Sequence, residues 1–78
     1  MHRLAPDLLA VFKPRGHEEL EHAHARRQRL LVLRGRLLVR TARRSLVLRP
    51  RDPALTLRPH QRHATTALAD TWVIAEYP

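Results

Sequence analysis

Three histidines and one glutamine are spaced so that they could share a metal ion. His22 and His24 are separated by one residue, Gln28 follows four positions later, and His63 lies much further along the chain. On a β-strand, residues i and i+2 point to the same face, whereas on a helix this pair would lie about 200° apart. Three imidazoles and one amide oxygen leave two positions open on an octahedral ion, and this set suits Fe, Mn, Ni or Zn as a divalent ion.

The metal hypothesis therefore requires His22 and His24 to lie on a strand. Residues 17–29 have good helix propensity, and a helix running to Leu33 with Gly35 as its cap is an alternative. Its apolar stripe would be broken twice by arginine, which disfavours an amphipathic helix. The segment divides better into a strand at Leu20–His24, a turn near 25–27 and a second strand at Gln28–Arg34.

The rest of the chain also reads as short strands separated by turns. Pro, Gly and Asp mark the turns, and alternating apolar residues mark the strands. This spacing predicts an all-β sandwich or barrel. Residues 1–12 are expected to be an N-terminal lead-in with a candidate edge strand, and residues 13–78 a single domain. The further strands expected are Leu8–Lys13, Arg36–Thr41, Ser45–Arg49, Ala54–Arg58, His63–Leu68 and Thr71–Tyr77.

The composition narrows the possible partners. There are fifteen Lys and Arg against seven Asp and Glu, a net charge of +8, but fourteen of the fifteen are Arg and they are scattered along the chain. With one Phe, one Trp and one Tyr there is no aromatic platform for stacking bases, so we do not expect nucleic acid as a partner. Cys is absent, which excludes disulfides and thiolate metal sites. No apolar run is long enough to span a bilayer, so we expect a cytoplasmic protein that does not contact membranes.

One strand predicts self-association. Leu30, Leu31, Val32 and Leu33 are apolar on both faces of the expected strand. A strand with one face in water would alternate. We therefore expect a homodimer in which a second subunit covers the outer face.

The metal-ligand stretch resembles the first cupin motif. The spacing Gly16-(x5)-His22-x-His24-(x3)-Gln28-(x6)-Gly35 matches that motif at every fixed position but one, because Gln28 stands where the family usually has Glu. In the weaker second motif only His63 matches, and its second Gly falls on His60. The stretch HAHARRQRLLVLRG is also similar to the sensing cupin domain of AraC-type regulators.

This resemblance implies a minimal, small antiparallel β-barrel or jelly roll with a metal held by His22, His24, Gln28 and His63. It implies either a metal-dependent cupin acting on a small organic acid or sugar, or a non-catalytic module that binds a small molecule without metal. A basic helical interaction protein built on residues 17–33 is the third alternative. No general acid–base pair, nucleophile elbow or phosphate loop is evident, so no catalytic residue or organic cofactor is assigned.

The remaining polar and aromatic residues are assigned more ordinary roles. His2, His17 and His60, together with the arginines at 26, 27 and 29, are expected to be solvated, with the pocket mouth as the alternative for His17 or His60. Arg58 is expected at the surface, with the pocket mouth as its alternative. Trp72 and Tyr77 are expected in the core or an interface.

Overall fold

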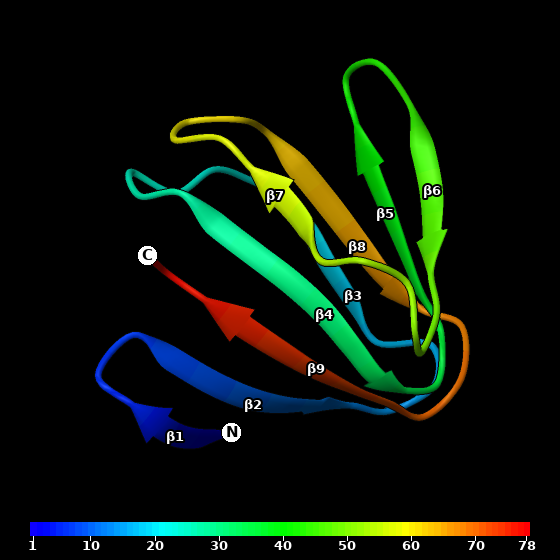
Figure 1. Ribbon diagram of the computed structural model, residues 1–78. Coiled ribbons are helices and arrows are strands. Elements are labelled where there is room, and N and C mark those ends of the chain that lie inside the picture. Colours follow the sequence, from blue (N-terminus) through cyan, green and yellow to red (C-terminus); the bar gives the residue numbers. More distant parts are fainter.

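A computed structural model describes all 78 residues and contains nine strands and no helix. The strands form two antiparallel sheets that face each other (Figure 1). The five-stranded sheet has the order β1-β2-β9-β4-β7, and the four-stranded sheet has the order β3-β8-β5-β6. The predicted small all-β, antiparallel architecture is confirmed. The strands are β1 (His2–Ala5), β2 (Leu8–Lys13), β3 (Glu18–His22), β4 (Gln28–Arg34), β5 (Leu37–Thr41), β6 (Ser45–Leu48), β7 (Leu55–Leu57), β8 (His63–Ala67) and β9 (Thr71–Glu76).

The helical alternative for residues 17–33 is wrong. That segment forms β3, a loop and β4, as the division into two strands and a turn predicts. β3 begins and ends two residues earlier than expected, so His24 lies just beyond the strand. The strand Gln28–Arg34 has the bounds that the sequence predicts.

The N-terminal residues contribute β1 and most of β2. β1 pairs with β2 at the edge of the five-stranded sheet, and β2 pairs along its whole length with β9. Every residue of β1 is exposed, so this strand depends on its backbone ladder to β2 rather than on burial of side chains. The structure has no helix that could span a membrane.

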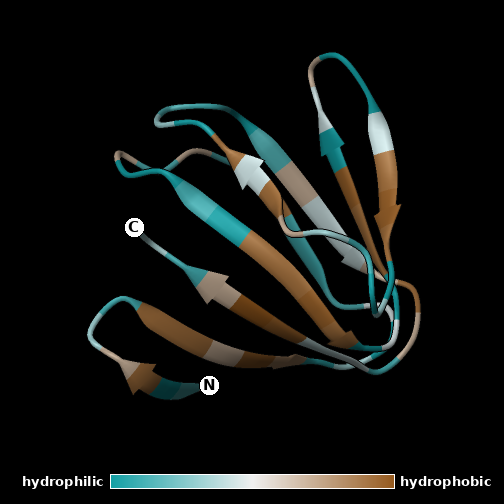
Figure 2. Cartoon of the chain, in the orientation of Figure 1, coloured by the Kyte–Doolittle hydropathy of each residue, from teal (hydrophilic) through white to brown (hydrophobic).

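The core lies between the two sheets. Leu37, Val39, Leu57 and Val73 are at most 2% exposed and alternate with outward-facing residues. Figure 2 shows β2 and the C-terminal half of β4 as apolar, whereas the first half of β4 and the loops beside it are hydrophilic. One end of the sandwich is therefore an apolar core, and the other can hold polar chemistry.

The apolar end is closed by a tight backbone approach at Gly35. Its φ is +92°, and an added Cβ would overlap the carbonyl oxygen of Asp70 and the hydroxyl of Thr71. Only glycine fits there, because it combines a left-handed conformation with no side chain. The Gly35 position of the motif is thus required by packing between the β4–β5 and β8–β9 turns.

The open end is formed by the β3–β4 and β7–β8 loops, which lie side by side in Figure 1. The backbone N–H of His60 donates to the carbonyl of His24 at 2.6 Å. His60 has a φ of +63°, a conformation that favours glycine, and this is the position where the second cupin motif has Gly. The neighbouring β7–β8 loop therefore fixes the backbone of His24.

Candidate metal site

The open end of the sandwich contains a cluster of three histidines. The potential ligand atoms of His22, His24 and His63 all lie within 4.8 Å of one another. The His22 and His63 ring centroids are 4.4 Å apart, those of His22 and His24 are 4.8 Å apart, and those of His24 and His63 are 5.4 Å apart. His22 and His63 face each other as a cross-strand pair of β3 and β8. The structure thus brings together the three histidines that the sequence predicts as ligands.

β3 contains a β-bulge between two residues that line the cavity, Glu19 and His22. Glu19 pairs with Thr65 and His22 pairs with His63, so three steps along β3 match two along β8. The extra residue leaves Leu20 exposed to solvent and allows Glu19 and His22 to face inward together. Nothing in the sequence indicates this bulge.

The rings of His22 and His63 are each oriented by a hydrogen bond to one nitrogen, which leaves the other nitrogen available as a ligand. His22 Nδ1 lies 2.7 Å from the Leu20 carbonyl oxygen, and His63 Nδ1 lies 3.0 Å from the Gln61 carbonyl oxygen. A carbonyl only accepts, so each Nδ1 carries the proton and donates it, which leaves Nε2 with its lone pair available. Backbone carbonyls commonly orient metal-ligating histidines in this way.

The surroundings also favour the neutral form of His63 and His24. Burial lowers the pKa of His63 below its usual value of 6.5, and the nearby His22 and His24 lower it further against a hydrogen bond to the Gln61 backbone. Burial, followed by the proximity of His22, lowers the pKa of His24. A neutral imidazole is the form that ligates a metal.

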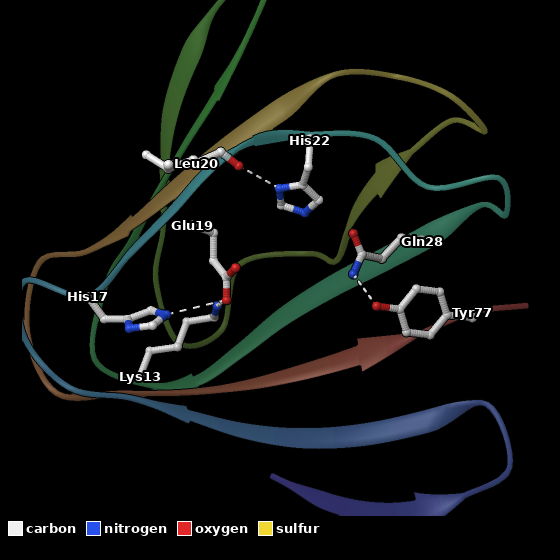
Figure 3. A network of polar contacts seen from close by, with 7 residues as sticks. All are labelled: Lys13, His17, Glu19, Leu20, His22, Gln28 and Tyr77. Carbon is white, nitrogen blue, oxygen red and sulfur yellow. Dashed lines mark hydrogen bonds and ion pairs between the residues drawn. The ribbon is translucent and has the colours of Figure 1, made fainter.

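Gln28 lines the same cavity from the first position of β4. Its Nε2 donates to the hydroxyl of Tyr77 at 2.9 Å, and its Oε1 is buried without any hydrogen-bond partner. In Figure 3 this oxygen points away from Tyr77, on the side where His22 lies. A buried acceptor without a donor is costly, and a metal ion beside the histidines would satisfy it.

The residues present therefore fit a divalent metal ion. Zinc lies about 2.0–2.1 Å from a ligating nitrogen, so ligation would draw the three rings slightly together from their present spacing. All four donors are uncharged, which leaves the full charge of an ion to be balanced by other groups.

Tyr77 also lines the cavity, a position that the sequence did not indicate. Its ring lies 5.8 Å from that of His24, and its hydroxyl holds the Gln28 amide. Arg26 donates to Asp7 and to the Tyr77 carbonyl, so this exposed arginine fastens the C-terminal residues beside the cavity. A lone tyrosine near a chain end carries no signal of such a role.

Lys13, Glu19 and Thr65 also line the cavity without having been predicted there. The Lys13 ammonium lies 3.0 Å from Glu19 Oε1, and together with His17 it forms the network drawn in Figure 3. Donation from Lys13 and then from His17 lowers the pKa of Glu19 despite the opposing effect of burial.

Other residues lie where they were expected or away from the site. His2, His17 and His60 are exposed, and so is Arg58, which does not line the cavity. Trp72 lies on the outer face of the five-stranded sheet and packs on Phe12, with ring centroids 5.2 Å apart. The cavity itself has a volume of about 210 Å³ and is walled by apolar residues from both sheets, including Leu9, Leu37 and Val73.

Several solved structures have the same fold as this chain. No protein-family profile matches the chain, and no curated protein matches it. KdgF from Halomonas sp. is 31% identical, with 91% of this chain and 67% of that chain covered and a TM-score of 0.73. The chain belongs to the cupin superfamily.

Two further cupin-fold structures illustrate the range of this similarity. A cupin superfamily protein from Desulfitobacterium hafniense gives a TM-score of 0.77 at 14% identity, with 99% of this chain and 83% of the other covered. HppE, solved with cobalt(II) and its substrate, gives a TM-score of 0.67 at 19% identity, with 94% of this chain and 45% of the other covered. The similarity to AraC-type sensing domains is not tested by these comparisons and stays a prediction.

Proposed function

We propose that this cupin domain binds one divalent transition metal ion and uses it to hold a small organic acid. His22, His24 and His63 would hold the ion, and Gln28 would add a neutral oxygen ligand. The observation that carries the proposal is the convergence of three imidazoles whose ligand atoms lie within 4.8 Å of one another. HppE, which has the same fold, was solved with cobalt(II), and this supports metal binding by a fold of this kind.

The ion would supply Lewis acidity in a cavity that the protein keeps largely apolar. The chain's own residues orient the site. Backbone carbonyls fix the rings of His22 and His63, and Tyr77 orients the Gln28 amide. An ion held by these four protein donors would act as a Lewis acid toward the carboxylate oxygens of a bound acid.

A thermal titration tests metal binding. We expect Fe, Mn, Co, Ni or Zn, added to metal-free protein, to raise the melting temperature. Ligand at 100 times its Kd stabilises a fold by about 2.7 kcal/mol, which for a domain of this size is a shift of roughly 10–20 °C. The His24→Ala variant should lose the shift, whereas His2→Ala, which removes an exposed histidine on the outer face, should keep it. A wild-type protein that no ion stabilises would contradict the proposal.

A metal-free binding module is the alternative, and the neutral donor set favours it. Glu at position 28 would contribute a negative charge to the ion, whereas the Gln28 amide does not, so metal affinity is lower than with a carboxylate. This alternative predicts that a small ligand stabilises the protein equally with and without a chelator such as EDTA. Loss of ligand binding in EDTA would exclude it.

A further inference from the structure

Lys13 differs from every other basic residue of the chain. It is the only lysine among fifteen basic residues, and all fourteen arginines are exposed. Lys13 is 8% exposed and lines the cavity. Lysine is rarely buried unless it is paired, so its position calls for a partner inside the cavity.

Glu19 only partly fills that requirement. One Glu19 oxygen accepts from Lys13 at 3.0 Å, and the same oxygen lies 3.3 Å from Nε2 of His17. The Glu19 side chain is 45% exposed, whereas that of Lys13 is 11% exposed. An ammonium has three N–H donors, and this is the one side-chain bond that Lys13 makes. Two donors therefore remain for a ligand.

An unpaired hydroxyl lies at the same level of the cavity. Thr65 is 5% exposed, faces inward from β8, and its Oγ1 has no hydrogen-bond partner. Thr65 is the cross-strand neighbour of Glu19, the residue that Lys13 contacts. Lys13 and Thr65 thus present unused polar atoms from opposite sheets.

The polar atoms of Lys13 and Thr65 lie deeper along the strands than the histidines, by one pair of residues on the inward face of β8. His63 and Thr65 are two residues apart on the same face of β8, which corresponds to about 6.6 Å. A ligand that contacted both levels would need polar groups at its two ends and a short apolar middle. The apolar walls of the cavity suit such a middle.

The net charge of the cavity indicates that the polar groups of the ligand are negatively charged. Glu19 is the one acidic residue that lines the cavity, and it is matched by Lys13. A divalent ion on four neutral donors would therefore leave an excess of two positive charges. Buried charge is costly unless it is paired, and a ligand with two carboxylates would balance it.

We propose that Lys13 and Thr65 form an anion subsite that binds the distal carboxylate of a short dicarboxylic acid, whose other carboxylate faces the histidines. The inference rests on the proposed function for the second contact, whereas the Lys13–Thr65 contact needs no metal. The volume of about 210 Å³ corresponds to about seven water molecules at ≈ 30 Å³ each. A compact acid such as succinate or glutarate suits this volume.

Calorimetric titration of zinc-loaded protein tests the subsite with matched acids. Glutarate is compared with valerate, and succinate with butyrate, so that each pair differs by one carboxylate at equal chain length. Hydrogen bonds to charged groups contribute enough for a preference of about tenfold or more for each diacid. Lys13→Met/Glu19→Gln removes the pair without changing the net charge and should reduce the preference to about threefold or less. Thr65→Val, which keeps the side-chain shape, should reduce it by a smaller factor.

A second ion pair provides the matched control. Arg29 and Glu76 lie on the outer face of the five-stranded sheet, 3.3 Å apart, so Arg29→Met/Glu76→Gln should leave the preference unchanged. Equal binding of diacid and monoacid by the wild type, or a preference that survives Lys13→Met/Glu19→Gln, overturns the subsite.

Failure of the metal site gives a different result. If zinc does not bind the wild type, the proposed function fails and the titration is repeated on metal-free protein. Glutarate binding that is lost in Lys13→Met/Glu19→Gln then still supports the subsite. No glutarate binding to the metal-free wild type overturns it as well.

Discussion

Replacing Gln28 by Glu would put a carboxylate at the position where the side-chain oxygen has no partner. The two side chains have nearly the same shape, and Gln28 is 7% exposed. In the metal-free protein the introduced carboxyl has no cation beside it, so burial should raise its pKa and lower the stability of the fold by about 1–3 kcal/mol. With a metal bound the effect reverses, because the carboxylate faces a double positive charge.

The gain in metal affinity can be estimated from charge and dielectric. Two unit charges 4 Å apart interact by about 4 kcal/mol at an effective dielectric constant of 20, hence about 8 kcal/mol for a divalent ion. Desolvation of the buried carboxylate takes back several kcal/mol. A net gain on the order of 2 kcal/mol remains, which is about thirtyfold in Kd.

Competition with a fluorescent chelator for Zn(II) at pH 7 measures this difference. The control is Thr56→Glu, which makes the same change in net charge at an exposed position of β7. The same Gln28→Glu variant should bind dicarboxylates more weakly, because it neutralises part of the positive charge. A zinc affinity equal to that of the control variant, or below that of the wild type, would refute a contact between position 28 and the metal.

Three further predictions concern stability and assembly. The pKa values of His24 and His63 in the folded protein are lowered from 6.5, so the unfolded chain binds more protons than the folded protein as the pH decreases. The free energy of unfolding of metal-free protein should therefore fall below about pH 6.5. Denaturant titrations of His24→Ala/His63→Ala should show a weaker decline. Gly35→Ala should cost roughly 3 kcal/mol or more in thermal unfolding, whereas Gly16→Ala, with a φ of +87° but open space around it, should cost about 1 kcal/mol; equal losses would contradict the proposed overlap. Leu33, 55% exposed, and Phe12, 43% exposed, predict a homodimer through the outer face, which Leu33→Glu should convert to monomer in light scattering; a monomeric wild type would exclude it.

Most of the strand order was predictable because turn residues and alternation are local signals. Gln28–Arg34 could be placed from its run of apolar residues, and its bounds agree with β4. β1 could not, since all its side chains are exposed and its pairing with β2 leaves no periodic pattern. Where a strand buries none of its side chains, composition carries little information.

The site was predictable only where spacing encodes it. His22 and His24 form a motif, and His63 follows at the start of a late strand, so the sequence alone brings all three to one hypothesis. The bulge after Glu19 arises from pairing between strands that are far apart in the sequence. The inward position of Lys13 likewise depends on tertiary packing, although a single lysine among arginines was a visible anomaly.

Metal content tests the central claim most directly. Purified protein is loaded with Zn(II) or Co(II), desalted and analysed by mass spectrometry, together with His22→Ala, His63→Ala and the exposed-site control His2→Ala. We predict about one ion per chain for the wild type and for His2→Ala, and a large loss for the other two variants. Equal metal content in His22→Ala, His63→Ala and the wild type would contradict a metal site built on these histidines.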